Sequence, residues 1–418
     1  MNRYCAALLS TLALALSASA ADWPRFRGPN GTGITAGTLP DIDAKSATWK
    51  VAIPGRGLSS PIVVGGKLFV QSASDDGAKR FLLCIDATTG KTLWTKEQFG
   101  SKAKTHNKNS LASMTPACDG ERVYCTSWDG ENQRLLAYDM SGKDLWQQPL
   151  GGFVSQHGPA NSPSVYQGIV FVNVDEDANL GGKAILSAFD AKTGEKKWAV
   201  ARKPYRASYT VPFLLERPNH PAALVLGTTT AVTGYEPATG KVLWSHAIEW
   251  PEGMMPLRMV GSPVYTDGVI VCSCGDGNGS RYAIAIDPEG TQTHPTKTWE
   301  LLKSTTPYVP SMIAQNGLVY WIADNGVPGC ASARSGKMLW NADRLSVKDV
   351  TASPILVGDE ILTINEAGKA FVLKADRKFE LIRESNVGEP VFASPALADG
   401  KLFIRGSKHL YCFAKKPA

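Results

Sequence analysis

The amino-acid sequence predicts an all-β protein, an eight-bladed β-propeller built from four-stranded antiparallel blades. Two observations predict this fold: a hairpin pattern that begins with proline returns along the chain, and a motif that ends with tryptophan returns in phase with it. The composition agrees, because 43% of the 418 residues are hydrophobic and 40 glycines and 26 prolines provide for many turns. No long apolar stripe at helical spacing stands out.

The hairpin pattern consists of a proline, an apolar run, a turn of Gly, Asp or Asn, and a second run rich in Val, Ile, Phe and Tyr. Such runs around a short turn are typical of two antiparallel strands, and a proline at the first position of a strand removes no hydrogen bond from the sheet. The eight prolines are Pro61, Pro116, Pro163, Pro212, Pro263, Pro310, Pro354 and Pro395. Their mean step of about 48 residues lies in the range of four-stranded propeller blades.

The tryptophan motif predicts the third and fourth strands of each blade and the tight turn between them. Its spacing is small-x-Asp-x-x-x-Gly-x-x-x-Trp, and the glycine supplies the positive φ that such a turn requires. The copies are CIDATTGKTLW (84–94), AFDAKTGEKKW (188–198), GYEPATGKVLW (234–244), CASARSGKMLW (330–340), the shorter AYDMSGKDLW (137–146) and the stretched AIDPEGTQTHPTKTW (285–299).

The two ends of the chain predict how the ring closes. The last hairpin is followed by one more strand and the chain stops before a fourth, whereas ATWKVAIPG around Trp49 offers an unpaired strand. Pairing these two segments would remove an exposed sheet edge. We therefore expect one propeller domain over 47–418, preceded by an extended segment over 21–46 in which Trp23 and Phe26 dock against the ring.

Residues 1–20 have the pattern of a secretory signal peptide, with Arg3, a short apolar run and ASA before a cleavage point after Ala20. The apolar run is too short for a stable membrane anchor, and no other stretch qualifies as transmembrane. Cys5 lies too early to be a lipoprotein cysteine. We expect a periplasmic or secreted protein and a monomer. The net charge of +6 falls to +5 after cleavage, which is a weak argument for nucleic acid, so no nucleic-acid partner is expected.

Seven cysteines remain after cleavage, and we expect them to be free and buried. Cys84, Cys330 and Cys412 take the small position of the third strand, where packing explains them. Cys118 and Cys125 are diagonal neighbours across a hairpin, which is too far for a disulfide. The Cys-x-Cys of Cys272 and Cys274 is a weak metal signal without a second pair.

The repeated motif resembles the tryptophan-docking motif of the quinoprotein propellers, which include dehydrogenases that use pyrroloquinoline quinone (PQQ) and non-catalytic relatives. The resemblance covers nearly the whole mature chain and implies that each indole stacks between its own blade and the next, where a small residue leaves room and about 200 Å² of apolar surface is buried. The implied docking residues are Trp49, Trp94, Trp146, Trp198, Trp244, Trp299 and Trp340. The opening WPRFRGPNGTG also resembles that of exported PQQ-like repeat proteins.

The resemblance also bears on catalysis. Catalytic quinoproteins are expected to carry adjacent cysteines, a Ca²⁺ site, a catalytic Asp and long insertions, but this sequence has no Cys-Cys pair and its repeats are nearly uninterrupted. The sequence therefore favours the non-catalytic branch, with no catalytic residue and neither PQQ nor Ca²⁺ as a cofactor. Nucleophile-elbow, zinc-protease and P-loop motifs are also missing.

We letter the strands of a blade A to D from the ring centre outward. The D–A and B–C connections of a propeller share one face, so residues before each proline are expected around a funnel-shaped channel mouth. Cationic side chains predominate there, and converging donors would favour an anionic ligand. The more ordinary explanation is that these are loop residues scattered around a solvent-filled rim. The candidates are His106, Asn109, His157, Asn161, Arg206, Tyr209, Arg258, Tyr308, Lys348 and Asp349.

The B–C loops contain DEDANLGG from Asp175 and GDGNG from Gly275. Hard oxygen ligands at this spacing suit Ca²⁺, which makes Asp175, Asp177, Asp276 and Asn278 candidate ligands. Turns use the same residue types, so this alternative stays open.

The expected function is that of an exported, non-catalytic scaffold with protein partners in the cell envelope, broadly similar to the BamB-type outer-membrane assembly propellers. Two alternatives use the funnel: a PQQ-binding oxidoreductase acting on alcohols or sugars, and a binder of polysaccharide or another anionic ligand.

Overall fold

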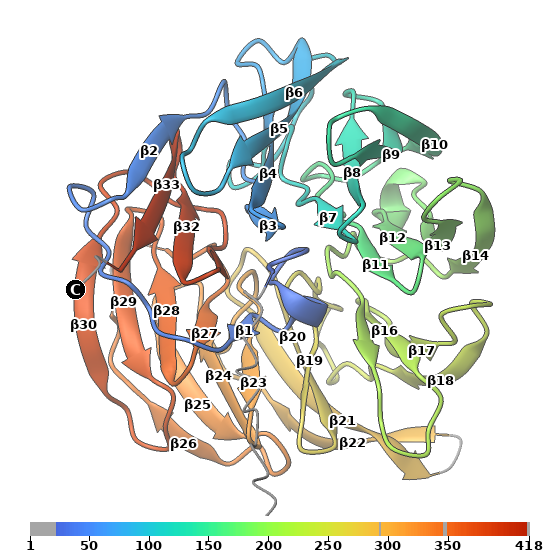
Figure 1. The fold of residues 1–418 in the computed structure, drawn as a ribbon. Helices are drawn as coiled ribbons and strands as arrows, with labels where there is room; N and C mark the ends of the chain where they lie inside the picture. The colour runs from blue at the N-terminus through green and yellow to red at the C-terminus, as the bar shows by residue number, and fades with distance from the viewer. Residues whose placement is uncertain (1–21, 292–293, 346–348, 416–418) are drawn as a thin grey trace, which may run out of the picture.

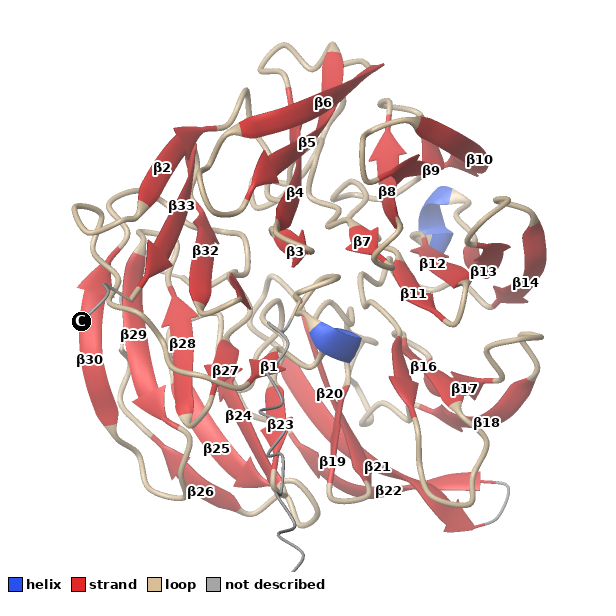
Figure 2. Cartoon of the chain, in the orientation of Figure 1, coloured by secondary structure: helices blue, strands red, loops and turns tan. Residues whose placement is uncertain are grey.

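The computed structural model describes residues 22–291, 294–345 and 349–415. The predicted signal peptide and the funnel candidate Lys348 lie outside the described residues. Eight sheets stand around a central axis, each with its first strand innermost (Figure 1). Strands make up nearly all of the regular structure (Figure 2). The predicted eight-bladed propeller is therefore confirmed.

The first four blades are each a sheet of consecutive antiparallel strands. Blade one contains β3 (Ile62–Val64), β4 (Lys67–Ala73), β5 (Lys79–Asp86) and β6 (Thr92–Phe99); blade two contains β7 (Ala117–Cys118), β8 (Arg122–Trp128), β9 (Asn132–Asp139) and β10 (Asp144–Gly152). Blade three contains β11 (Ser164–Tyr166), β12 (Ile169–Asp175), β13 (Ala184–Asp190) and β14 (Lys196–Arg202); blade four contains β15 (Phe213–Leu215), β16 (Ala223–Gly227), β17 (Ala231–Tyr235) and β18 (Val242–Ala247).

The second half of the ring repeats this plan. Blade five contains β19 (Val264–Thr266), β20 (Val269–Gly275), β21 (Arg281–Thr291) and β22 (His294–Leu301); blade six contains β23 (Ile313–Gln315), β24 (Leu318–Ile322), β25 (Pro328–Ser332) and β26 (Met338–Asn341). Blade seven contains β27 (Ile355–Val357), β28 (Glu360–Ile364), β29 (Lys369–Lys374) and β30 (Leu381–Asn386); blade eight contains β31 (Ala396–Ala398), β32 (Lys401–Arg405), β33 (His409–Ala414) and β2 (Trp49–Ala52). Every inner strand begins within three residues of its predicted proline.

The ring closes as the sequence predicts. Strand β2 pairs antiparallel with β33, with Trp49 opposite Cys412. The outermost strand of blade eight thus comes from the other end of the chain, and this pairing gives β33 a partner on its outer edge.

The tryptophans link each blade to the next. The indole Nε1 of Trp49 donates to the carbonyl of Ala87 in blade one at 3.2 Å, and that of Trp146 donates to Ala191 in blade three at 3.1 Å. Trp94, Trp198, Trp299 and Trp340 bond in the same way to Met140, Pro237, Ala333 and Asp376. The buried Nε1 of Trp244 has no partner among the described residues, and the following blade holds the stretched copy of the motif.

The motif glycine therefore has two roles. Gly194 has φ 75°, which an L side chain rarely adopts, and a Cβ on it would lie 2.5 Å from the Trp146 ring of the preceding blade. The small residue has the role expected of it, since it lies directly across the C–D pair from its own tryptophan, as Ala188 does from Trp198.

The segment before β2 crosses the ring centre instead of lying on its outer surface (Figure 1). Trp23 bridges to Val63 of blade one, and Pro24 accepts a hydrogen bond from Cys118 of blade two. After the short 3-10 turn η1 (Pro29–Gly31), strand β1 (Ile34–Thr35) pairs parallel with β27, so blade seven has five strands. The fifth strand forms because the inner edge of β27 is otherwise free.

All seven cysteines of the described residues are free and buried. Among these residues no helix is long and apolar enough to cross a lipid bilayer.

Candidate functional site

A ring of hydroxyl groups joins the inner strands of the blades. We call the side chains of Ser60, Thr115, Ser162, Ser262, Ser311, Ser353 and Ser394 the hydroxyl ring. The backbone N–H of Ser311 donates to Ser353 Oγ, that of Ser353 to Ser394 Oγ, and that of Ser394 to Ser60 Oγ, at 2.9–3.0 Å. The bonds continue from Ser60 to Thr115 and Ser162 and, beyond a gap, from Val211 to Ser262 and Ser311.

The gap in the ring is Val211, which stands where the other blades have a hydroxyl. Six of the seven ring members directly precede a strand-A proline, whereas Ser311 follows Pro310. A recurring Ser/Thr-Pro pair in the sequence is therefore the signal of this ring, in addition to the strand start that the proline predicts. Each hydroxyl provides an acceptor for a buried N–H that neighbouring strands leave unpaired.

A cavity of about 530 Å³ extends from this ring to the face formed by the D–A and B–C loops. Six of the ten funnel candidates line it: His106, Asn109, His157, Tyr209, Tyr308 and Asp349. Asn161, Arg206 and Arg258 are not among its lining residues. Asn161 is buried. Its side-chain Nδ2 donates to Gln133 Oε1, and its backbone carbonyl accepts from the Thr126 hydroxyl.

The two arginine candidates point to partners in the protein. Arg206 donates to the carbonyl of Pro256 at 3.1 Å. Arg258 is buried and lies 3.4 Å from Asp177 and 3.3 Å from the side chain of Gln156. The guanidinium of Arg258 is therefore compensated by a buried carboxylate.

The calcium candidates are also engaged within the protein. Asp175 forms an ion pair of 2.5 Å with Arg202, and Asp177 accepts the N–H groups of Gln156 and Ala207. Asp276 accepts the N–H groups of Asn278 and Ser280, which closes a turn. In the part of the chain that the structure describes, no group of three or more His, Cys, Asp or Glu side chains is arranged to hold a metal ion.

These residues do not fit a quinoprotein centre. Such a centre needs carboxylate and amide oxygens free to ligate Ca²⁺ beside the quinone, whereas the candidate carboxylates here serve arginines and backbone amides. That the chain uses neither PQQ nor Ca²⁺ stays a prediction.

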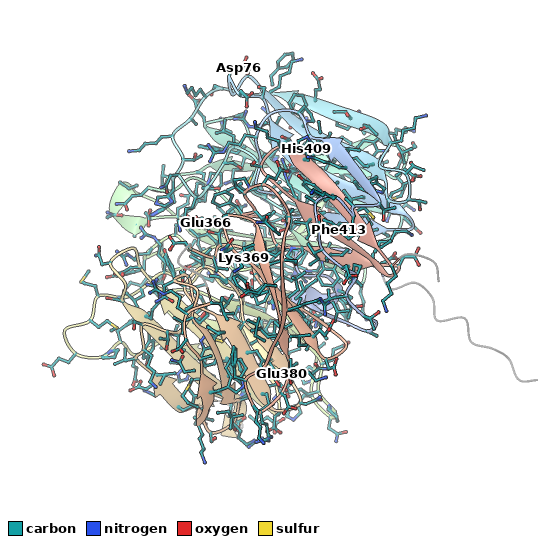
Figure 3. The ribbon with its side chains drawn as sticks, turned by 90° about the vertical axis from the view of Figure 1, so that its left-hand side faces the viewer. Asp76, Glu366, Lys369, Glu380, His409 and Phe413 are labelled. Atoms are coloured by element: carbon teal, nitrogen blue, oxygen red, sulfur yellow. The ribbon has the colours of Figure 1, made fainter. Side chains whose placement is uncertain are left out.

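The cavity mouth carries ion pairs that the sequence did not indicate. Lys108 lies 2.7 Å from Asp349 and 2.8 Å from Glu366, so the long loop after blade one reaches the loops of blade seven. Figure 3 shows Glu366 and Glu380 at opposite ends of blade seven. Arg281 lies 3.5 Å from Asp324, which also accepts the N–H of Tyr308 at 2.7 Å. Burial raises the pKa of Asp324 above its usual value.

Two histidines meet at the mouth. The rings of His106 and His157 are 5.0 Å apart, and the carbonyl of His157 accepts from the N–H of His106 and from Asn109 Nδ2. Burial, together with the positive charge of Arg258, lowers the pKa of His157 to about 4. His157 is therefore neutral at pH 7, and its buried Nδ1 has no partner among the described residues.

The comparisons with known proteins agree with this architecture. A family model described as "Outer membrane protein assembly factor BamB" matches residues 35–114 and 81–342. The chain belongs to the BamB-type family of PQQ-like β-propeller repeat proteins. One BamB-type relative, the outer membrane protein assembly factor BamB of Burkholderia pseudomallei (strain K96243), is 24% identical over 379 residues, which are 87% of this chain and 86% of that protein.

Solved structures of differently named proteins have this fold. BamB from Moraxella catarrhalis matches with a TM-score of 0.63 and 12% identity over 89% of this chain and 98% of that one. A europium-containing methanol dehydrogenase matches with a TM-score of 0.66 and 13% identity over 94% of this chain and 98% of that one. Because a BamB and a methanol dehydrogenase match equally well, these likenesses show the fold alone.

Proposed function

We propose that this protein is an exported, non-catalytic scaffold of the cell envelope that takes part in the assembly of outer-membrane proteins. The observation that carries the proposal is the similarity to an outer membrane protein assembly factor along 87% of this chain and 86% of that relative. Similarity of this extent must cover most of the ring, so it favours a common use of the assembled surface over the sharing of single repeats.

The chemistry of the cavity supports a non-catalytic role. Lys108 and Arg281 are each paired with a carboxylate, which leaves neither of them as a free base or electrophile at the mouth. Burial raises the pKa of the Cys84 and Cys125 thiols to about 12, so these groups stay protonated and unreactive.

Exposed apolar side chains on the mouth face offer a surface for a protein partner. Phe99 is 89% exposed and Met255 is 67% exposed, and both lie at D–A connections. The apolar rim, as we name it, consists of Phe99, Val154, Leu180, Met255 and Leu302, all in or beside D–A and B–C connections. Five other exposed apolar side chains of the described residues lie in fourth strands or C–D turns, but the two most exposed, Phe99 and Met255, belong to the apolar rim, and such groups favour protein contact.

Site-specific photo-cross-linking in intact cells tests the proposal. A photoreactive amino acid replaces Phe99 at one end of β6, and a matched control replaces Leu93, an exposed residue near the other end of the same strand. We expect a discrete adduct with an outer-membrane assembly protein from position 99 and none from position 93. Deletion of the gene should also lower the level of folded outer-membrane proteins. Unchanged levels together with identical cross-linking at both positions would reject the proposal.

A further inference from the structure

The part of the hydroxyl ring that borders the cavity is a set of unused hydrogen-bond donors. The hydroxyl arc consists of the six ring members that line the cavity: Ser311, Ser353, Ser394, Ser60, Thr115 and Ser162. Each is at most 6% exposed, and each oxygen already accepts a backbone N–H. A hydroxyl has one hydrogen to donate, and within the described residues none of these six donates it. The arc therefore presents O–H groups to the cavity.

Two uncompensated positive charges lie beside the cavity floor. Phe26 of the N-terminal segment lines the cavity, and the residues on either side of it are Arg25 and Arg27, which are 6% and 1% exposed. Their guanidinium groups donate to the carbonyls of Pro212 and Met312, which directly precede the inner strands β15 and β23 of blades four and six. Among the described residues neither forms an ion pair.

The charge of these arginines persists at neutral pH. Burial lowers the pKa of Arg25 to about 10 and that of Arg27 to about 9, so both stay protonated at pH 7. Buried charges are normally paired, and two neighbouring cations without a carboxylate create a positive potential in a region of low dielectric constant. An anion in the cavity would meet this potential.

The charges at the mouth contribute less to this field. Lys108 lies against both Asp349 and Glu366, Arg281 pairs with Asp324, and Asp276 also lines the cavity, so the mouth adds no positive potential. The cavity joins the mouth to the hydroxyl arc without interruption, since residues of both line it. A small ligand thus has a route from solvent to the donors at the floor.

We propose that the floor of this cavity is a binding site for a small anion rich in acceptor oxygens, a phosphate or carboxylate group, held by the hydroxyl arc above Arg25 and Arg27. Convergent O–H donors and a positive potential both select acceptors and negative charge. The site is independent of the scaffold role, because it requires only the folded chain.

Isothermal titration calorimetry of the purified exported protein tests the proposal, with inorganic phosphate and citrate as probes and maltose as a neutral, hydroxyl-rich control. Saturable binding of either anion, with no heat from maltose, is the expected result. Binding of phosphate alone would show that the site takes a single tetrahedral anion. Binding of citrate alone would show that it takes a ligand with several carboxylate groups. Binding of maltose alone, or of none of the three, would overturn the proposal.

Two serine variants separate binding from folding. Ser353→Ala removes an arc hydroxyl, and Ser262→Ala removes a ring hydroxyl that does not line the cavity; each loses one equivalent backbone hydrogen bond of 3.0 Å. Loss of a hydrogen bond to a charged group should weaken anion binding about tenfold or more in Ser353→Ala. Binding by Ser262→Ala should be unchanged although its stability falls similarly. Equal affinities for wild type and Ser353→Ala would refute the site, and Ser353→Thr, which keeps the hydroxyl, provides the comparison if Ser353→Ala does not fold.

Discussion

The linkage between blades can be measured at the turn glycines of blade three. Gly194 and Gly168 have nearly the same positive φ, 75° and 74°. They differ in surroundings, because a Cβ on Gly194 would lie 2.5 Å from Trp146 of blade two, whereas a Cβ on Gly168 would have nothing within 4 Å. Substitution of each by alanine therefore separates backbone strain from contact between blades.

Both alanine variants should lose stability, but by different amounts. The left-handed backbone costs about 1 kcal/mol for alanine at either position. At Gly194 the added methyl group must also displace the indole, and overpacking of this kind costs about 1–3 kcal/mol more. The free energy of unfolding should thus fall by about 1 kcal/mol in Gly168→Ala and by about 2–4 kcal/mol in Gly194→Ala.

Urea denaturation followed by tryptophan fluorescence measures this difference. Blade two provides a second pair, since a Cβ on Gly142 would lie 2.8 Å from Trp94, whereas Gly120 is open and has φ 95°. The same ordering should appear in both pairs. Equal losses within each pair would show that the indole does not rest on the turn of the next blade, and the account of how the ring is held together would fail.

Three further outcomes follow from the described contacts. Val211→Ser should supply an acceptor for the Ser162 N–H, complete the hydroxyl ring and raise the free energy of unfolding by about 0.5–1.5 kcal/mol in the same urea assay; a lower stability would contradict this. The pKa of His157 is about 4 when folded and near 6.5 when unfolded, so the unfolded chain binds the proton first and stability should fall as pH drops from 6.5 to 4. The melting temperature of His157→Asn should fall less over that window, and parallel curves would exclude the effect. Removal of residues 22–35 from the exported chain should lower the melting temperature and make the inner strands sensitive to protease, because this segment pairs with β27 and bridges to blade one.

The fold could be predicted because its determinants are local and repeated. The spacing from Cys84 to Trp94 encodes one strand, one turn and one strand, and the structure pairs these two residues across the C–D pair. A single copy of this motif would fit several β folds. Copies that recur in phase with eight prolines fit only a propeller with eight blades. Ring closure could also be predicted, because the last repeat lacks its fourth strand and the N-terminal part of the chain has an extra strand that pairs there.

The N-terminal segment could not be placed from the sequence, because its partners are remote in the chain. Arg25 bonds to a residue 187 positions away, and Arg27 to one 285 positions away. No spacing of residues in the sequence indicates either of these two contacts. Its Gly and Pro content indicated an irregular path, but only the assembled inner strands determine where that path runs.

The charge of the funnel also could not be predicted, because it depends on partners that are remote in the chain. Arg258 stands before a strand-A proline and was expected to contribute positive charge at the mouth, yet the structure pairs it with Asp177 of another blade. The position of a loop in the repeat predicts which face of the ring its side chains lie on. Whether a charged side chain there is paired depends on residues from other blades, which only the folded ring places beside it. The sequence around Lys108 gives no sign of its ion pairs, because its carboxylate partners Asp349 and Glu366 lie far along the chain in the loops of blade seven.

The contacts that hold neighbouring blades together and the loops that surround the cavity lie on opposite faces of the ring. The C–D turns that receive the indoles, such as the turn at Gly194, lie on the face opposite the D–A and B–C loops that form the cavity mouth. Loops on the mouth face can therefore change without loosening the contacts between blades. This separation explains how an assembly factor and a methanol dehydrogenase can both match this chain at TM-scores of 0.63 and 0.66 with only 12% and 13% identity. The mouth loops, the hydroxyl arc and Phe26 of the N-terminal segment line the cavity, so they are the residues at which the proposed anion site can be tested.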